Sequence, residues 1–158
     1  MGADLYLNSV WHSWWAESRE RILAGPDCDA ISEMVASGGY FRNSYNTGDV
    51  MWATGLSWPE TVGGMLDSEG YLAVERVLAM IEARPLTKER LGQHYFDCIA
   101  HGVEEHPITG WLFRSLGGLP TVPPDFETFA AFLRQRRTEL IALLEKSVAL
   151  NEPLLCSV

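Results

Sequence analysis

Hydrophobic residues recur at intervals of three and four over most of the chain, which is the spacing of one face of an α-helix. The longest such run covers residues 125–150, where one stripe holds Phe126, Phe129, Leu133, Leu140, Leu143 and Leu144. Shorter runs predict helices over residues 9–23, 30–37, 49–54, 68–83 and 87–100, and another after Pro59. Pro85 ends one of these helices, and Thr87 is placed to cap the next. The pattern therefore predicts a mainly α-helical fold.

Both ends of the chain depart from this helical spacing. Residues 3–7 and 153–158 are short apolar segments that suit strands better than helices. We expect that they can pair with each other in a small two-stranded sheet. Between them, residues 38–48 are rich in glycine, asparagine and aromatic side chains, a composition typical of a loop. The expected architecture is a single-domain multi-helix bundle with, at most, this small sheet.

Length and composition agree with one compact domain. The chain has 158 residues, of which 47% are hydrophobic and 21% are charged, so a disordered tail or a low-complexity linker is excluded. A chain of this length buries about two thirds of the surface that its unfolded form exposes. No internal repeat and no Ser-, Gly- or Pro-rich linker divides the sequence. We therefore expect residues 1–158 to form one globular domain.

The balance of charge is acidic and uneven. Twelve Lys and Arg against 21 Asp and Glu give a formal charge of −9, which argues against direct binding to the phosphate backbone of nucleic acid. Residues 1–79 hold four basic and eleven acidic side chains, whereas residues 80–158 are closer to neutral. Such a field can steer a partner with a basic surface toward the N-terminal half. The alternative is that the charge serves solubility alone.

Signals for membranes and secretion are not evident in the sequence. No stretch of about 18 apolar residues predicts a membrane span, and the N-terminus lacks the basic start and apolar run of a secretory signal. Cys28, Cys98 and Cys156 are odd in number and widely spaced, which is typical of reduced thiols rather than of disulfides. We therefore predict a cytoplasmic protein that does not associate with membranes.

The most specific group of potential metal ligands is His94, Cys98 and His101. Spacings of four and three place the three side chains on one face of a helix. Imidazole and thiolate ligands at this spacing could bind zinc, with a fourth ligand from the loop that follows. The chain has no second pair of ligands and no CxxC or HExxH pattern, so the alternative is a small core cysteine flanked by histidines. We expect no cofactor, with zinc as the alternative.

Motifs that carry catalytic chemistry are absent from the sequence. It has no GxSxG elbow, no phosphate-binding loop of the Walker type and no GxGxxG turn. A nucleophile at Cys98 or Cys156 would need a histidine and a carboxylate nearby in space, and no local pattern indicates such a site. The sequence thus favours a non-catalytic protein. The alternative is a small metal- or thiol-dependent enzyme centred on His94, Cys98 and His101.

One short segment combines the side chains that often anchor protein interfaces. Tyr40, Arg42, Asn43 and Tyr45 place aromatic rings beside a lone cation inside an acidic region. Tyrosine and arginine are enriched among the residues that dominate binding energy. The alternative is that Phe41 and Tyr45 fill the core while Arg42 neutralises a nearby carboxylate.

Two further sets of residues extend this candidate contact surface. Asp27, Asp29 and Glu33 supply negative charge in a region where Arg42 is the only cation for many residues on either side. The tryptophans near the N-terminus cannot all face one core from a single helix, because neighbouring positions diverge by about 100°. We expect Trp11 or Trp15 to be partly exposed and to mark a contact surface.

The apolar stripe of residues 125–150 allows two uses. Its residues alternate at three and four with Arg136 as a polar interruption, a pattern similar to a coiled-coil seam. Such a seam could join two copies of the chain into a homodimer. The commoner use of an apolar stripe is packing within its own domain, and both uses remain open at this point.

Several segments of the chain are similar to those of a known group of proteins. The chain begins MGADLY, carries GYFRNSYN at residues 39–46 and LSW at residues 56–58, and ends with EPLLCS after a helix that contains RTELIALLE. It resembles a family of small bacterial and phage proteins that share the MGADLY start and a GYFR-[DN]-SYN segment. The likeness touches both ends and the middle, and the family brings no activity. Members with Asp in that segment differ from this chain at Asn43, which argues against a catalytic acid there.

The resemblance implies an origin in phages or mobile elements, whose small acidic proteins often inhibit host defence machines by occupying a basic surface. We therefore expect a non-catalytic protein-binding module with a protein partner that carries a basic surface. Its most specific form is an anti-CRISPR-like inhibitor of a host complex that handles nucleic acid. A homodimeric structural protein is a further alternative.

Overall fold

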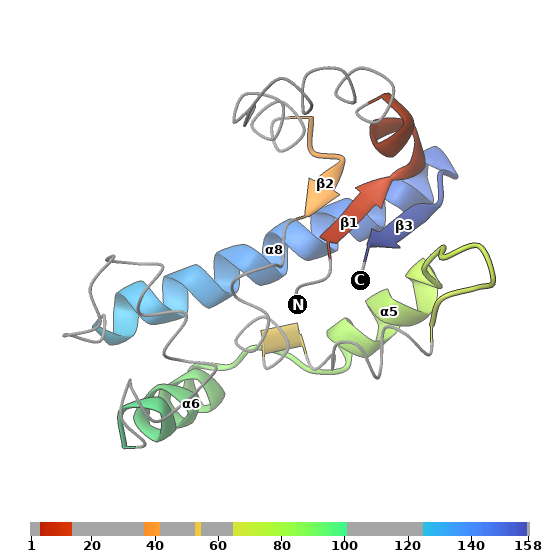
Figure 1. Ribbon diagram of the computed structural model, residues 1–158. Helices are drawn as coiled ribbons and strands as arrows, with labels where there is room; N and C mark the ends of the chain where they lie inside the picture. Colours follow the sequence, from red (N-terminus) through yellow and green to blue (C-terminus); the bar gives the residue numbers. More distant parts are fainter. Residues whose placement is uncertain (1–3, 14–36, 42–52, 55–64, 101–124, 158) are drawn as a thin grey trace.

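The computed structural model describes residues 4–13, 37–41, 53–54, 65–100 and 125–157 (Figure 1). Its named elements are, in chain order, β1 (Asp4–Leu7), β2 (Tyr40–Phe41), α5 (Val74–Glu82), α6 (Lys88–Ala100), α8 (Phe126–Leu150) and β3 (Leu154–Ser157). Residues 8–13 and 53–54 are also helical. The prediction of a mainly helical fold is confirmed, and a small three-stranded antiparallel sheet accompanies the helices. In the part of the chain that the structure describes, no helix combines the length and the apolar character that crossing a membrane requires.

The sheet joins the two ends of the described chain. Its strand order is β2-β1-β3, so β1 is the central strand and pairs antiparallel with both neighbours. Leu5 lies opposite Phe41 on one side and opposite Cys156 on the other. The pairing of β1 with β3 confirms the predicted association of the two apolar end segments.

Strand β2 corrects the sequence-based interpretation of residues 38–48 as a loop. Tyr40 and Phe41 pair with Tyr6 and Leu5 of β1. A strand of two residues is too short to produce an alternating pattern of apolar and polar positions. Its pairing is therefore set by contact with the neighbouring strand rather than by its local sequence.

Two glycines bring β2 close to the beginning of the helix at residues 8–13. Gly38 has a φ of 64°, a left-handed conformation that glycine adopts at little cost. The N–H group of Leu7 donates to the carbonyl oxygen of Gly39 at 2.8 Å. A Cβ atom on Gly39 would overlap Cγ2 of Val10 and would lie 3.3 Å from Cδ1 of Leu7. The absence of a side chain at residue 39 therefore allows this strand to approach β1.

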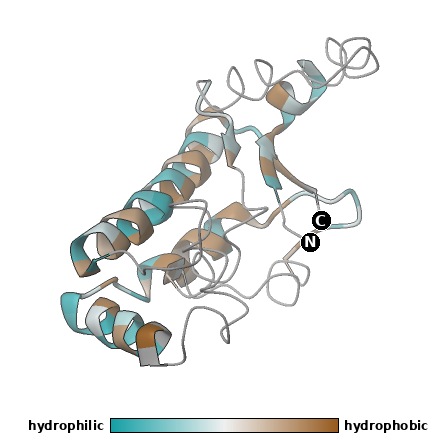
Figure 2. Ribbon diagram, turned by 60° about the vertical axis from the view of Figure 1, so that its left-hand side comes forward, coloured by the Kyte–Doolittle hydropathy of each residue, from teal (hydrophilic) through white to brown (hydrophobic). Residues whose placement is uncertain are grey.

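Helix α8 contacts two groups of buried side chains. Its C-terminal half packs against the sheet and α5 in the larger group, which includes Leu5, Leu7, Phe41, Val77, Ile81, Leu140, Leu143 and Leu144. Its N-terminal half packs against α6 in the smaller group, which holds Ala53, Leu91, Phe129, Ala130 and Leu133. Figure 2 shows hydrophobic and hydrophilic residues along the whole length of this helix. Helix α8 therefore connects the two parts of the core.

The ends of α8 and α6 agree with the predicted bounds. Asp125 caps α8 by accepting a hydrogen bond from the N–H group of Thr128 at 2.9 Å, and this bond lowers the pKa of the Asp125 carboxyl. Asn151 ends the helix in a left-handed conformation with a φ of 49°. Thr87 accepts a hydrogen bond from the N–H group of Arg90 at 3.3 Å and so caps α6, as the sequence predicts.

The helix predicted over residues 68–83 begins later than expected, at Val74. The carboxylate of Asp67 accepts hydrogen bonds from the backbone N–H groups two and four residues later, both at 2.9 Å. Gly70 has a φ of 86°, which reverses the direction of the chain. These features hold the segment in a turn, because a side chain that bonds the nearby backbone competes with helix formation.

Two consecutive arginines tie α8 to its neighbours. The guanidinium of Arg136 lies 4.2 Å from the centre of the Phe41 ring in β2. Arg137 donates from Nη2 to the carbonyl oxygens of Ile81 at 2.8 Å and of Arg84 at 3.3 Å. Both oxygens lie at the C-terminal end of α5, which has no basic residue in its own last turn. Arg137 therefore caps α5 from the adjacent helix.

Alanine substitutions at two glycines should change stability in opposite directions. Gly39→Ala places a methyl group against Val10 and should lower the free energy of unfolding by about 1–3 kcal/mol. Gly92→Ala lies inside α6, where a Cβ atom meets nothing within 4 Å, and should raise it by about 0.5–1 kcal/mol. Chemical denaturation of both variants measures the two changes. Equal effects would contradict the close approach at residue 39.

Candidate interaction surface

Tyr40, which the sequence analysis assigns to a contact surface, is a buried residue of the sheet. It is 8% exposed, and its ring stacks on that of Tyr6 with the ring centres 4.9 Å apart. Its hydroxyl donates to Oδ2 of Asp4 at 3.1 Å. Ring and hydroxyl are both engaged inside the chain, which favours a structural role for Tyr40, and its assignment to a contact surface stays a prediction from the sequence. Phe41 is buried as well, which agrees with the alternative that it fills the core.

Trp11 keeps part of its surface accessible. Its ring meets that of Tyr6 edge-on, with the ring centres 5.0 Å apart and an angle of 61° between the planes. Tyr6 and Tyr40 form a small buried group here, and Val10 and Trp11 pack against it. Because side chains alternate along a strand, this group lies on the face of the sheet opposite to Leu5 and α8. Trp11 is partly exposed, as expected for one of the N-terminal tryptophans.

The other residues of the predicted contact surface lie outside the described residues. They are Asp27, Asp29, Glu33, Arg42, Asn43, Tyr45 and Trp15. Their assignment to a contact surface stays a prediction from the sequence.

The predicted metal ligands are described in part. The ring of His94 packs against Phe129 with the ring centres 5.6 Å apart. The side chain of Cys98 and the whole of His101 lie outside the described residues. Among the side chains that the structure does describe, no three His, Cys, Asp or Glu groups are placed to hold a metal ion. The zinc site stays a prediction from the sequence.

The apolar stripe of α8 is used inside the chain. Four residues of the predicted seam are at most 3% exposed: Phe129, Leu133, Leu140 and Leu143. Arg136, the polar interruption of the seam, is engaged with Phe41 of the sheet. The stripe therefore packs within its own fold, which was the alternative to a homodimer seam.

Cys156, one of the two candidate nucleophiles, has an environment that keeps it protonated. It lies on β3 opposite Leu5 and is partly buried. Burial and, to a smaller degree, the charge of Asp4 together raise the pKa of its thiol to about 11. A reactive cysteine needs the opposite shift, toward the thiolate. This arrangement therefore does not support a nucleophilic role for Cys156.

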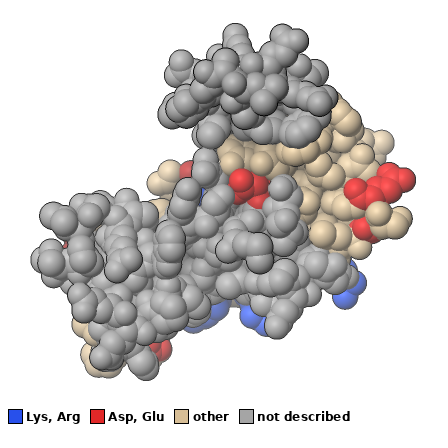
Figure 3. All heavy atoms as spheres, in the orientation of Figure 1, with Lys and Arg blue, Asp and Glu red and all other residues tan. Residues whose placement is uncertain are grey.

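An acidic surface lies at the end of the molecule where α5 begins. Asp67 and Glu69 in the turn before this helix, and Glu75 in its first turn, are exposed. Figure 3 shows acidic side chains gathered at this end, on the right-hand side of the view. Within the described residues, none of the three forms an ion pair. We call these three residues the acidic end.

A shallow groove with one exposed apolar side chain, that of Val148, adjoins the acidic end. The groove has a volume of about 300 Å³ and is lined by Glu75 of α5 together with Ser147 and Val148 of α8. Val148 and Leu150, in the last turn of α8, are 46% and 55% exposed. Neither residue is among the contact residues predicted from the sequence. Their one signal in the sequence is that they are apolar but lie outside the main stripe of the helix.

The raised pKa of Cys156 predicts a dependence of stability on pH. The thiol stays protonated in the folded chain at pH values where it ionises in the unfolded chain. The free energy of unfolding should therefore fall as the pH rises from the ordinary thiol pKa of 9.0 toward about 11. Cys156→Ala should remove this part of the dependence, measured by chemical denaturation at several pH values. An unchanged profile in the variant would contradict the assignment.

Comparisons of this chain with protein-family models, with curated proteins and with solved structures found no match. We therefore infer function from the surfaces of the molecule itself.

Proposed function

We propose that this chain is a non-catalytic protein-binding module whose acidic half engages a basic surface on a partner protein. The observation that carries the proposal is the acidic end, where Asp67, Glu69 and Glu75 are exposed without an ion pair among the described residues. Opposite charges across an interface raise the rate of encounter and select the correct partner. Three exposed carboxylates that form no ion pair with another described residue are suited to that role.

Apolar surface next to the acidic end supports the same proposal. Protein interfaces combine an apolar centre with a polar rim, and charge alone gives little affinity. Val148 supplies an exposed apolar side chain in the groove beside Glu75, and this groove supplies a hollow for a partner's side chain. The groove and the acidic end together therefore provide an apolar part and a polar part of an interface.

The most specific form of the proposal is an anti-CRISPR-like inhibitor, encoded by a phage or mobile element, that acts on a host complex handling nucleic acid. Surfaces that bind nucleic acid carry clustered Lys and Arg. An acidic protein surface can occupy such a cluster in place of phosphate groups. The resemblance to phage proteins and the formal charge of −9 support this form. It predicts that nucleic acid and this chain compete for one surface of the partner.

Charge reversal at the acidic end tests the proposal. The tagged chain is used to capture its partner from host lysate, and the purified pair is then titrated by calorimetry. The double variant Glu69→Lys, Glu75→Lys should bind about tenfold more weakly or worse, a loss of ~1.4 kcal/mol. The remaining affinity should depend less on salt, because fewer opposite charges are brought together.

Glu127→Lys is the matched control. Glu127 is exposed and lies in the first turn of α8, as Glu75 lies in the first turn of α5. Both substitutions remove the same favourable interaction with a helix N-terminus. An equal loss of affinity in the control would show a general effect of charge and would reject the acidic end as the contact.

Two further measurements separate the parts of the proposal. Reversal of Asp27, Asp29 and Glu33 in one variant should also weaken binding if the contact extends over the N-terminal half. Unchanged affinity would confine the contact to the acidic end. Single-stranded DNA added to the purified pair should displace the chain if the partner's nucleic-acid surface is occupied. Binding that DNA does not affect would reject the anti-CRISPR-like form while leaving the protein-binding module intact.

A further inference from the structure

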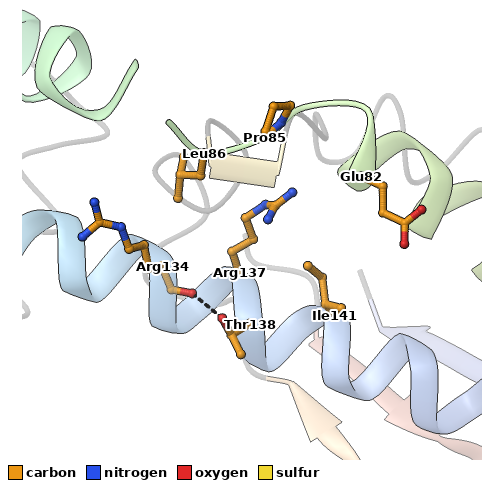
Figure 4. A pocket seen from close by; sticks show the side chains of 7 residues that line it. All are labelled: Glu82, Pro85, Leu86, Arg134, Arg137, Thr138 and Ile141. Atoms are coloured by element: carbon orange, nitrogen blue, oxygen red, sulfur yellow. Dashed lines mark hydrogen bonds between the residues drawn. The ribbon is translucent and has the colours of Figure 1, made fainter. Parts of the chain in front are cut away.

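A second groove lies between α8 and the segment that joins α5 to α6 (Figure 4). Its volume of about 490 Å³ falls within the range of about 300–1,000 Å³ that is usual for small-molecule sites. Helix α8 contributes Arg134, Arg137, Thr138 and Ile141 to its lining. The other wall consists of Glu82, Pro85 and Leu86.

Arg137 is fixed in this groove before any ligand arrives. Its two hydrogen bonds to the end of α5 both leave from Nη2, so the guanidinium is held by the fold. Arg134 lies one turn earlier on the same face of α8 and is exposed. Figure 4 shows the side chain of Arg137 extending from α8 toward the segment that carries Pro85 and Leu86, whereas the side chain of Arg134 points away from Arg137. The groove thus presents one fixed and one adaptable guanidinium.

The lining of the groove is net positive, because it holds two arginines and one carboxylate, that of Glu82. Neither Arg134 nor Arg137 forms an ion pair within the described residues, whereas Arg136 between them is paired with Glu139. Like charges at this helical spacing disfavour each other. Nε of Arg137 is in addition a buried donor without an acceptor. A bound anion would offset the repulsion between the two guanidinium groups.

The rest of the lining restricts what kind of anion fits. Pro85 and Leu86 give an apolar wall opposite α8, and Ile141 lies on the other side of Arg137 from Arg134. The hydroxyl of Thr138 donates to the carbonyl oxygen of Arg134 at 2.9 Å, so its proton is already used. Glu82 lies on the other side of Arg137 from Arg134 in Figure 4, and its charge keeps an anionic group on the Arg134 side.

We propose that this groove binds a small amphipathic anion, with its carboxylate on Arg137, within reach of the adaptable Arg134 side chain, and its aliphatic chain against Pro85 and Leu86. Charge-assisted hydrogen bonds from guanidinium groups hold the head, and burial of the chain adds affinity that the head alone lacks. The site is separate from the acidic end, because the two lie at opposite ends of α5.

Octanoate is the probe for this site, added to the ¹⁵N-labelled full chain and followed by NMR. The backbone signal of Leu86 and the Nε–H signal of Arg137 should shift and saturate, with a Kd of about 1 mM for a ligand of this size. Acetate has the carboxylate but lacks the long aliphatic tail, and octylammonium has the tail but carries a positive charge. Each should bind about tenfold more weakly or not at all.

Arg134→Gln and Arg84→Gln form a matched pair of variants. Both remove one exposed arginine near the end of α5, but only Arg134 lines the groove, and the backbone oxygen of Arg84 that Arg137 uses is retained. Arg134→Gln should weaken octanoate binding about tenfold, while Arg84→Gln should leave it unchanged. Equal effects of the two substitutions, shifts that do not saturate, or equal binding of acetate would each overturn the proposal.

Discussion

The strand β1 must be covered on both edges and on both faces, and the rest of the fold is arranged around this requirement. Leu5 and Leu7 face α8, while Tyr6 faces the aromatic group on the other side. The two edges of β1 pair with β2 and β3, which are far from β1 in the sequence. A further bond holds the two ends of the described chain together: the backbone N–H group of Ser9 donates to the carboxylate of Glu152. Closing such long loops costs entropy and slows folding, so the buried cluster on α8 has to offset that cost.

The two candidate surfaces lie at opposite ends of helix α5 and carry opposite charge. Its nine residues span about 13 Å, with Glu75 in the first turn and the carbonyl oxygens that Arg137 caps at the other end. An acidic residue suits the N-terminus of a helix and a cation suits its C-terminus, because of the aligned peptide dipoles. Glu75 and the cap from Arg137 suit the two ends of this helix, whereas Arg76 near its start and Glu82 at its end do not. Helix α5 has no basic residue in its own last turn, and the cation that caps its C-terminal end is Arg137 of α8.

Local signals made much of the fold predictable, and long-range contacts account for the rest. The limits of α8 and α6 follow from Asp125 and Thr87, whose side chains bond within their own first turn. The strand at Tyr40 was missed because its structure is imposed by β1. The late start of α5 was missed because Asp67 holds a turn that leaves no trace in the spacing of apolar residues.

The candidate surfaces were predictable to a smaller degree. The acidity of the region that includes Asp67, Glu69 and Glu75 is visible in the sequence, but their exposure at one end is not. The groove at Arg134 and Arg137 depends on how the segment after α5 packs against α8, which no local pattern encodes. Periodicity reports which side of a helix is apolar, and it does not report which neighbours leave a hollow beside it.

The pairing of Asp4 with Ser157 has a consequence for the connectivity of the chain. Residues opposite each other in an antiparallel pair have Cα atoms about 4.5–5.5 Å apart, so a linker of a few residues would join these two positions without disturbing the sheet. A circular chain of this kind loses less entropy on folding, because the longest loop is already closed in its unfolded state. The same geometry would allow new ends to be opened at an exposed segment elsewhere, with the sheet becoming a continuous hairpin.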